Sequence, residues 1–107
     1  MEAFTQLYET ICTRKKNSEE GSYTAYLFDQ GLEKTCKKVG EESGEVIIAA
    51  MKNDTQELIN EICDEIYHLF VLMAQCDISL SEIETELAKR SQKTNNRKPE
   101  RKKIEQY

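Results

Sequence analysis

The sequence of 107 residues has no tryptophan and a single proline, Pro99. Proline interrupts the hydrogen-bond ladder of a helix, so nothing of that kind breaks a helix before residue 99. The alternating, β-branched runs typical of half-buried strands are also missing. Apolar residues recur instead at spacings of three and four, which is the period of an α-helix. The sequence therefore predicts an all-α fold with one domain's worth of residues.

The cysteines are few and lack the spacing of a binding motif. There is no CxxC pair, which argues against a zinc or redox site, and we expect buried free thiols in a reducing compartment. The first residues carry an acid where a signal peptide would be basic, and residues 69–74, the longest apolar run, are too short to span a bilayer. We expect a cytoplasmic protein without a membrane partner. The four thiols are Cys12, Cys36, Cys63 and Cys76.

Charge is distributed unevenly along the chain. Residues 89–107 hold eight Lys or Arg and two Glu, a net charge of +6, so residues 1–88 carry −11 of the total of −5. A strongly acidic folded part of the chain argues against nucleic acid as a partner. Residues 93–107 have almost no apolar content, and we expect a disordered basic tail there, following a helical domain at residues 1–92.

Apolar periodicity and capping signals predict an antiparallel bundle of about four long helices. We expect a helix over residues 2–16, and a short one that begins at Ser22 or Thr24 and breaks at Gly31. Further helices are expected over residues 32–52, over residues 54–75 after a turn at Asn53, and from residue 79 on. The last two begin with capping-box spacing, and the last helix should place Ile83 and Leu87 on its inner side.

The helix predicted over residues 32–52 carries three glutamates along one edge. At 100° per residue, Glu41, Glu42 and Glu45 fall within a 100° arc, beside the apolar stripe. Gly40 and Gly44 flank them. Because glycine inside a helix costs about 1 kcal/mol relative to alanine, we expect another helix or a ligand to approach closely there.

The next helix repeats this pattern. Its acids and its histidine share an arc of about 100°, and apolar residues surround the rest, so we expect it to be central and buried. We expect His68 to be an inward-facing side chain with its hydrogen bonds satisfied, rather than a metal ligand. The residues of the arc are Glu57, Glu61, Asp64, Glu65 and His68.

A tight turn joins these two helices, so they should pack antiparallel with their acidic edges facing one another. Facing carboxylates repel, and burial disfavours their ionised forms, unless a divalent cation lies between them. Oxygen ligands favour Mg²⁺, or Mn²⁺, over Zn²⁺. The alternative is a solvated acidic face that forms salt bridges with Lys34, Lys37 and Lys38. Lys38, one turn from the glutamates, suits either a phosphate or such a salt bridge.

Four segments resemble signatures of the phosphoribosyl-ATP pyrophosphatases of histidine biosynthesis. Residues 22–28 are similar to the N-terminal signature, residues 37–46 to the metal-binding helix, residues 61–69 to the second acidic segment, and residues 78–90 to the last helix. The resemblance covers about residues 4–90. The acidic motif is shared with MazG-like and dimeric dUTPase-like pyrophosphohydrolases. The Ser-Tyr-Thr start of the first segment narrows the resemblance to the histidine-pathway branch.

The resemblance implies the all-α nucleotide pyrophosphohydrolase fold, a homodimer, and Mg²⁺-dependent hydrolysis of phosphoribosyl-ATP to phosphoribosyl-AMP and pyrophosphate. Two departures are Ser43-Gly44, where alanine is more usual, and Glu65, where an apolar residue is usual. Glu42 or Glu45 would orient or deprotonate the attacking water. The implied metal ligands are Glu41, Glu42, Glu45, Glu61 and Asp64, and the implied substrate contacts are Lys34, Lys37, Lys38, Tyr23 and Thr24.

Two other functions fit the same residues. A MazG-like house-cleaning pyrophosphatase would act on noncanonical nucleoside triphosphates and would not need the phosphoribosyl group on the adenine. A non-catalytic helical dimerisation module would carry the acids only as solvated surface.

Overall fold

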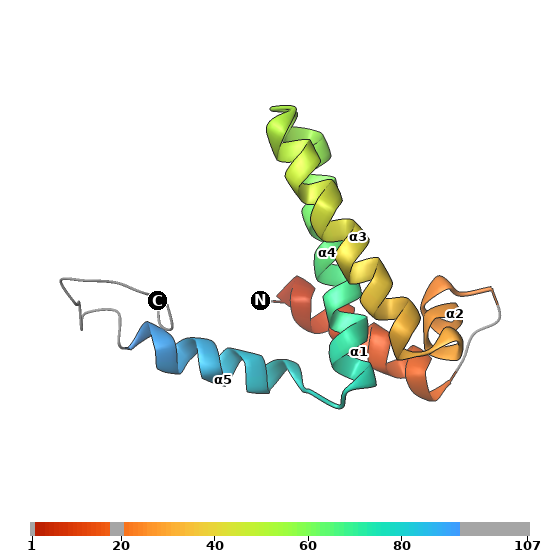
Figure 1. Ribbon diagram of the computed structural model, residues 1–107. Coiled ribbons are helices and arrows are strands. Elements are labelled where there is room, and N and C mark those ends of the chain that lie inside the picture. The colour runs from red at the N-terminus through yellow and green to blue at the C-terminus, as the bar shows by residue number, and fades with distance from the viewer. Residues whose placement is uncertain (1, 18–20, 93–107) are drawn as a thin grey trace. The chain divides into compact units, whose positions relative to one another are not determined.

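The computed structural model describes residues 2–17 and 21–92, and all regular structure in these ranges is helical. The predicted all-α fold is therefore confirmed, with the short helix counted as the second of five. The predicted tail over residues 93–107 lies outside the described residues, and the domain boundary at residue 92 stays a prediction. The helices, labelled in Figure 1, are α1 (Glu2–Lys16), α2 (Tyr23–Gln30), α3 (Leu32–Met51), α4 (Thr55–Gln75) and α5 (Leu80–Ser91).

The helix starts follow the capping signals. Ser22, rather than Thr24, caps α2 by accepting a hydrogen bond from the backbone N–H of Ala25. Asp54 caps α4 in the same way. Ser79 and Glu82 form the full reciprocal capping box at the start of α5.

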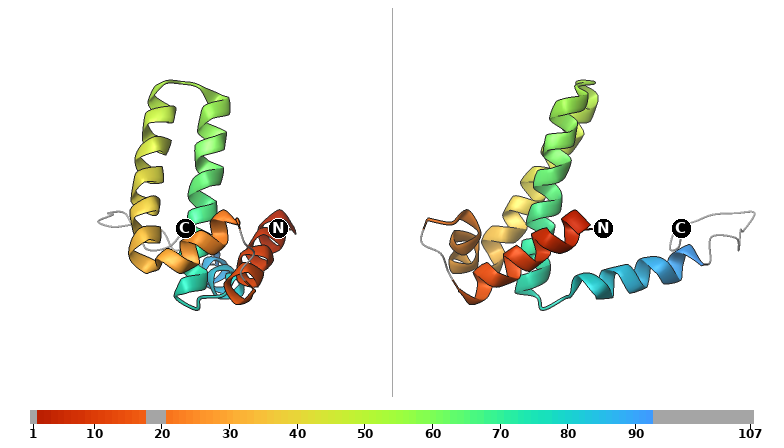
Figure 2. Two further views of the ribbon diagram at one scale, coloured as in Figure 1. Left: turned by 90° about the vertical axis from the view of Figure 1, so that its right-hand side faces the viewer. Right: turned by 180° about the vertical axis from the view of Figure 1, so that it is seen from behind.

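The chain divides into two compact units, one up to Asp77 and one from Ile78 on. In the first unit, α3 and α4 run antiparallel, and Asn53 adopts a left-handed conformation in the turn between them. Figure 2 shows α1 and α2 packed against the end of this hairpin away from the turn. Fully buried Ile11, Leu27 and Val71 fill the core at that end.

Aromatic contacts join α1 to α4. Phe70 is buried in α4, and its ring meets the rings of Phe4 and Tyr8 edge-on at centroid distances of 5.9 and 5.5 Å. Such edge-to-face pairs add to the burial of apolar area. Lys15, near the end of α1, donates a hydrogen bond to the carbonyl of Ala74. The C-terminal half of α4 is thus the fixed centre of the first unit.

The prediction that the whole of α4 is central and buried is wrong for this chain by itself. Ile59 and Ile62 are 48% and 41% exposed, because α1 and α2 cover only the other end of the hairpin. Met51, beside the turn, is 82% exposed. The expected burial of the thiols is wrong as well. Cys12 is half-buried, but Cys36 on α3, Cys63 on α4 and Cys76, just after the end of α4, are exposed.

The second unit contains α5, which buries none of its residues. Ile83 is 38% exposed and Leu87 is 43% exposed, so the second unit by itself does not bury the predicted inner side of this helix. Among the described residues, no helix is long and apolar enough to cross a membrane.

Gly31 makes the sharp break between α2 and α3. Its φ of 95° and ψ of −179° lie in a region that is essentially restricted to glycine. Its N–H donates to the carbonyl of Leu27, and its carbonyl accepts from the N–H of Thr35. The predicted break at Gly31 is confirmed, and it sets the direction in which α3 leaves α2.

We predict that Gly31→Ala lowers the free energy of unfolding by about 1–3 kcal/mol, because a Cβ strains this backbone conformation. Urea denaturation followed by circular dichroism would measure the loss. Asp29→Ala is the control, since this exposed residue of α2 should change stability by less than about 0.5 kcal/mol. Equal stability of Gly31→Ala and wild type would contradict the argument.

Candidate acidic active site

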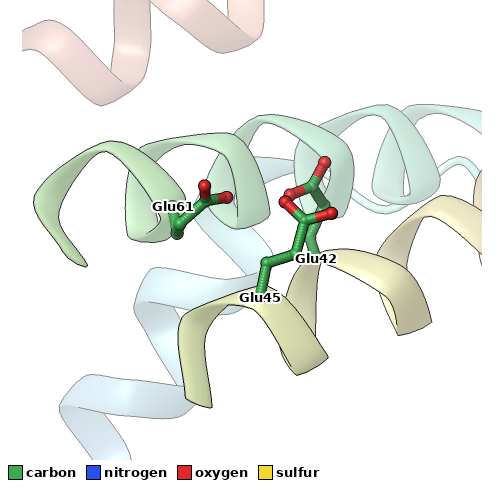
Figure 3. Close-up of side chains that lie close together, drawn as sticks. All are labelled: Glu42, Glu45 and Glu61. Carbon is green, nitrogen blue, oxygen red and sulfur yellow. The ribbon is translucent and has the colours of Figure 1, made fainter. Parts of the chain in front are cut away.

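Three glutamates meet across the α3–α4 hairpin. Glu42 and Glu45 project from α3 toward Glu61 of α4, as Figure 3 shows, and one carboxylate oxygen from each lies within 4.8 Å of the others. Residues three apart share a helix face, which explains the α3 pair. The antiparallel register then brings Glu61 opposite them. The structure therefore brings together three of the five predicted metal ligands.

This glutamate cluster, formed by Glu42, Glu45 and Glu61, is only partly open to solvent. Glu42 is 7% exposed, while Glu61 is half-buried and Glu45 is exposed. Oε2 of Glu42 and Oε1 of Glu61 are buried and have no hydrogen-bond partner among the described residues. A buried carboxylate oxygen without a partner is costly. These two atoms are therefore candidates for contact with a ligand.

The same crowding shifts the protonation of the glutamate cluster. A hydrogen bond with Glu45, then burial, then the charges of neighbouring acids raise the pKa of Glu61 to about 7. Burial, followed by the charges of Glu45 and Asp64, raises the pKa of Glu42 above its ordinary value. Raised carboxyl pKa values where acids of two helices meet are typical of functional sites.

The remaining two predicted ligands differ in their surroundings. Asp64 lies close enough for its charge to raise the pKa of both Glu42 and Glu61. Glu41 instead forms an ion pair with Lys38, whose Nζ lies 3.3 Å from Oε1 of Glu41. This hydrogen bond is the largest cause of the raised pKa of Lys38. Lys38 thus forms the predicted salt bridge, and its phosphate contact and all five ligand roles stay predictions.

The two departures from the family pattern touch each other. The hydroxyl of Ser43, on α3, donates a hydrogen bond to Glu65, on α4. The other oxygen of Glu65, Oε1, is buried and has no partner in the described structure. The sequence indicated each departure separately, but only the hairpin register shows that they form one polar contact beside the glutamate cluster.

Gly40 and Gly44 do not mark a close approach within this chain. A Cβ added at either position would meet no side chain or neighbouring helix within 4 Å. Of the two expected neighbours, another helix is therefore excluded among the described residues, and a ligand stays a prediction. Glycine at these positions leaves open space on α3 beside Glu41 and Glu45.

An aromatic group borders the glutamate cluster on the α2 side. His68 is 5% exposed, as predicted for an inward-facing side chain, and its Nε2 lies 3.1 Å from the hydroxyl of Tyr23. The Tyr23 ring stacks on those of Tyr26 and Tyr67 at 6.0 Å. Thr24 shares a hydrogen bond with the Tyr67 hydroxyl. Sequence reasoning missed Tyr67, although its place next to His68 on an otherwise apolar helix was a signal.

The predicted substrate contacts lie along one side of α2 and the first turns of α3. Tyr23 is 46% exposed, and its phenol is close enough to influence the pKa of Lys38. Lys34 lies over the ring of Tyr26, with Nζ 6.0 Å from the centroid, a cation–π geometry. Lys37 is exposed. Of the predicted substrate contacts, Lys38 is the one paired with a carboxylate, and the substrate roles of all five stay predictions.

Comparison with known proteins agrees with this arrangement. The family model for phosphoribosyl-ATP pyrophosphohydrolase matches residues 4–91. A phosphoribosyl-ATP pyrophosphatase of Clostridium novyi (strain NT) is 50% identical over 105 residues, covering 98% of this chain and 96% of that protein. Proteins of the same name from Clostridium botulinum (strain Kyoto) and Listeria welshimeri are 58% identical over 99 residues and 52% identical over 100 residues. They cover 92% and 94% of this chain, and 90% and 95% of their own length. The chain belongs to the phosphoribosyl-ATP pyrophosphohydrolase family of enzymes.

Proposed function

We propose that this protein hydrolyses phosphoribosyl-ATP to phosphoribosyl-AMP and pyrophosphate in histidine biosynthesis, in a reaction that depends on Mg²⁺. The observation that carries the proposal is the glutamate cluster between α3 and α4, in a chain that belongs to the phosphoribosyl-ATP pyrophosphohydrolase family. Four unpaired thiols are consistent with the reducing cytoplasm as its location.

The residues of the cluster fit a hard divalent cation. They offer carboxylate oxygens only, and two of these oxygens are buried without a partner. Glu42, Glu45 and Glu61 would hold the metal, with Asp64 next to them and Glu41 available on breaking its ion pair with Lys38. Bound there, Mg²⁺ would neutralise negative charge on the phosphates, which is the main need of phosphoryl chemistry.

The chain's own residues divide the remaining tasks. Glu42 is held rigidly by burial, whereas Glu45 is exposed and reaches solvent water, so these two carboxylates are the candidates for orienting or deprotonating the nucleophile. Lys38, Lys37 and Lys34 would pair with the phosphates. Tyr23 and Thr24 would border the rest of the substrate.

A substrate panel separates the proposed activity from its alternatives. Pyrophosphate release would be measured with phosphoribosyl-ATP, ATP and noncanonical nucleoside triphosphates, each with Mg²⁺ or EDTA. Turnover of phosphoribosyl-ATP far above the others supports the proposal. Preference for noncanonical triphosphates would indicate a house-cleaning enzyme, and no turnover of any substrate would leave only the non-catalytic module.

We also propose a homodimer, in which a second copy covers the exposed apolar residues at the turn end of the hairpin. Ile47, Met51 and Ile59 are 63%, 82% and 48% exposed, on the two helices that carry the glutamate cluster. A chain of this length has a limited core of its own, and burying these side chains would stabilise it.

We predict that Glu42→Gln abolishes pyrophosphate release while the thermal midpoint holds or rises, because the change is isosteric and removes one repelling charge. Glu57→Gln is the matched control on α4. Glu57 pairs with Lys52 at 3.4 Å, outside the cluster, so this variant should keep its activity. Wild-type turnover by Glu42→Gln at saturating Mg²⁺ would refute the metal-site assignment.

We predict that the metal-free protein loses stability as pH rises from about 4.5 to 7. The pKa of Glu61 is higher in the folded chain than its ordinary 4.5, so the folded state binds more protons across this window and unfolding is favoured as pH increases. Mg²⁺ should therefore raise the melting temperature most above pH 7. At 100 times its dissociation constant, a cation that binds only the folded state adds about 2.7 kcal/mol to the free energy of unfolding. Identical melting curves in EDTA and Mg²⁺ at pH 8 would rule out a cation site.

We predict that Ile47→Glu shifts the protein from dimer to monomer, because an apolar interface cannot bury an unpaired carboxylate without a large cost. Light scattering coupled to gel filtration would measure the molar mass. Glu33→Lys, an exposed change at the other end of α3, is the control and should remain dimeric. A monomeric wild type would remove the basis of the dimer proposal.

A further inference from the structure

The hydrogen bonds of His68 run between two different elements. On α4, Nδ1 lies 2.9 Å from the backbone carbonyl oxygen of Asp64. On the other side of the ring, Nε2 lies 3.1 Å from the hydroxyl of Tyr23, the first residue of α2. The ring is almost fully buried, and its edge contacts with Tyr23 and Tyr67 restrict its rotation.

The partners determine where the hydrogen atoms lie. A carbonyl oxygen only accepts, so Nδ1 of His68 carries a hydrogen and donates it to Asp64. Nε2 of the neutral ring is then an acceptor, and the Tyr23 hydroxyl donates to it. One imidazole thus connects the backbone at a predicted metal ligand to the hydroxyl of a predicted substrate contact.

We propose that His68 is a positioning residue, which holds the Tyr23 hydroxyl beside the glutamate cluster and thereby sets where α2 borders the substrate. The inference rests on the proposed function, because it assigns a role to Tyr23 in the same site. His68 acts through Tyr23 rather than through Glu42. Its Nδ1 is 3.9 Å from Oε1 of Glu42, beyond hydrogen-bond distance, and is already bonded to Asp64.

The exposure of Tyr23 explains why its hydroxyl needs holding. Its side chain is 46% exposed, and it stacks on Tyr26, which is 44% exposed. Stacking fixes the plane of a ring but leaves it free to slide within that plane. The bond to His68 fixes the position of the hydroxyl, and the rigid C-terminal half of α4 provides the anchor.

Nuclear magnetic resonance tests the bond without any substrate. His68 is the only histidine of the chain, so its ring nitrogens need no assignment. At about pH 8.5, where a free imidazole is neutral, we expect the Nδ1–H form, with an Nε2 shift typical of an acceptor. In Tyr23→Phe the Nε2 shift should move toward that of a free ring nitrogen. A proton on Nε2, or an unchanged Nε2 shift in Tyr23→Phe, would overturn the proposed bond.

Kinetics tests the positioning role. Tyr23→Phe and His68→Asn should each lower kcat/KM for phosphoribosyl-ATP by about 2- to 10-fold, the effect of one neutral hydrogen bond, mainly through a higher KM. The double variant should have a kcat/KM no lower than that of the less active single variant, because both substitutions remove the same interaction. His68→Gln, whose amide oxygen can reach the place of Nε2, should recover at least half of the wild-type value.

Several outcomes would overturn the inference. The first is a loss of kcat/KM in the double variant that equals the product of the two single losses. The second is a fall in kcat together with weakened Mg²⁺ binding, which would indicate that His68 acts through Glu42. The third is a His68→Gln variant that is no more active than His68→Asn. Melting curves identify misfolded His68 variants, and Tyr23→Phe removes only one hydroxyl from a half-exposed ring. A wild type that binds Mg²⁺ but does not hydrolyse phosphoribosyl-ATP would refute the proposed function, while the resonance measurement still tests the bond.

Discussion

Mutual repulsion among Glu42, Glu45 and Glu61 is the constraint that the rest of the first unit must overcome. Three carboxylate oxygens lie within 4.8 Å of one another, in surroundings that hide Glu42 almost completely. When ionised, these groups would favour water and separation. Burial and neighbouring charges raise the pKa of Glu42, and a hydrogen bond with Glu45, followed by burial and the charges of nearby acids, raises the pKa of Glu61. Apolar packing elsewhere in the hairpin holds them together. The proposed metal site would thus be built at the cost of local stability.

The force that opposes this repulsion is concentrated at one end of the molecule's first unit. Burial of Val71, Phe70 and Ala74 against α1 and α2 fixes the C-terminal half of α4. Since helices are stiff over this length, fixing one half of α4 also fixes the position of Glu61 relative to α3. The turn end has little covering it, and Met51 is 82% exposed there. The proposed dimer would supply the packing that a single chain lacks.

The second helix links packing to chemistry. Leu27 is fully buried, which docks α2 onto the core, and Gly31 then redirects the chain into α3. As a result Tyr23 lies beside His68, 45 residues further along the chain, and its ring borders the glutamate cluster. A short helix with one buried residue thereby places the Tyr23 ring against the histidine that borders the carboxylates. Its position follows from the burial of Leu27, the break at Gly31 and the hydrogen bonds of Tyr23 and Thr24 to α4.

The sequence by itself determined the local features of this protein. Helix bounds followed from period and capping, because a cap such as that of Ser79 involves residues only three apart. The sharing of an edge by Glu42 and Glu45 followed from helix geometry alone. The resemblance of the motifs to the pyrophosphatase family also required no structure, and the family comparison agrees with it.

Only the tertiary structure decided which of those features meet and which lie exposed. The contact of Ser43 with Glu65, the pairing of Glu41 with Lys38 and the bond between Tyr23 and His68 depend on register, rotamer and docking angle. The exposure of Ile59 and of three thiols contradicted the sequence expectation, because periodicity identifies an apolar face but not whether anything in the same chain covers it. Side-chain pattern is a local property, whereas burial depends on the position of every other segment, and that is the physical reason for the difference.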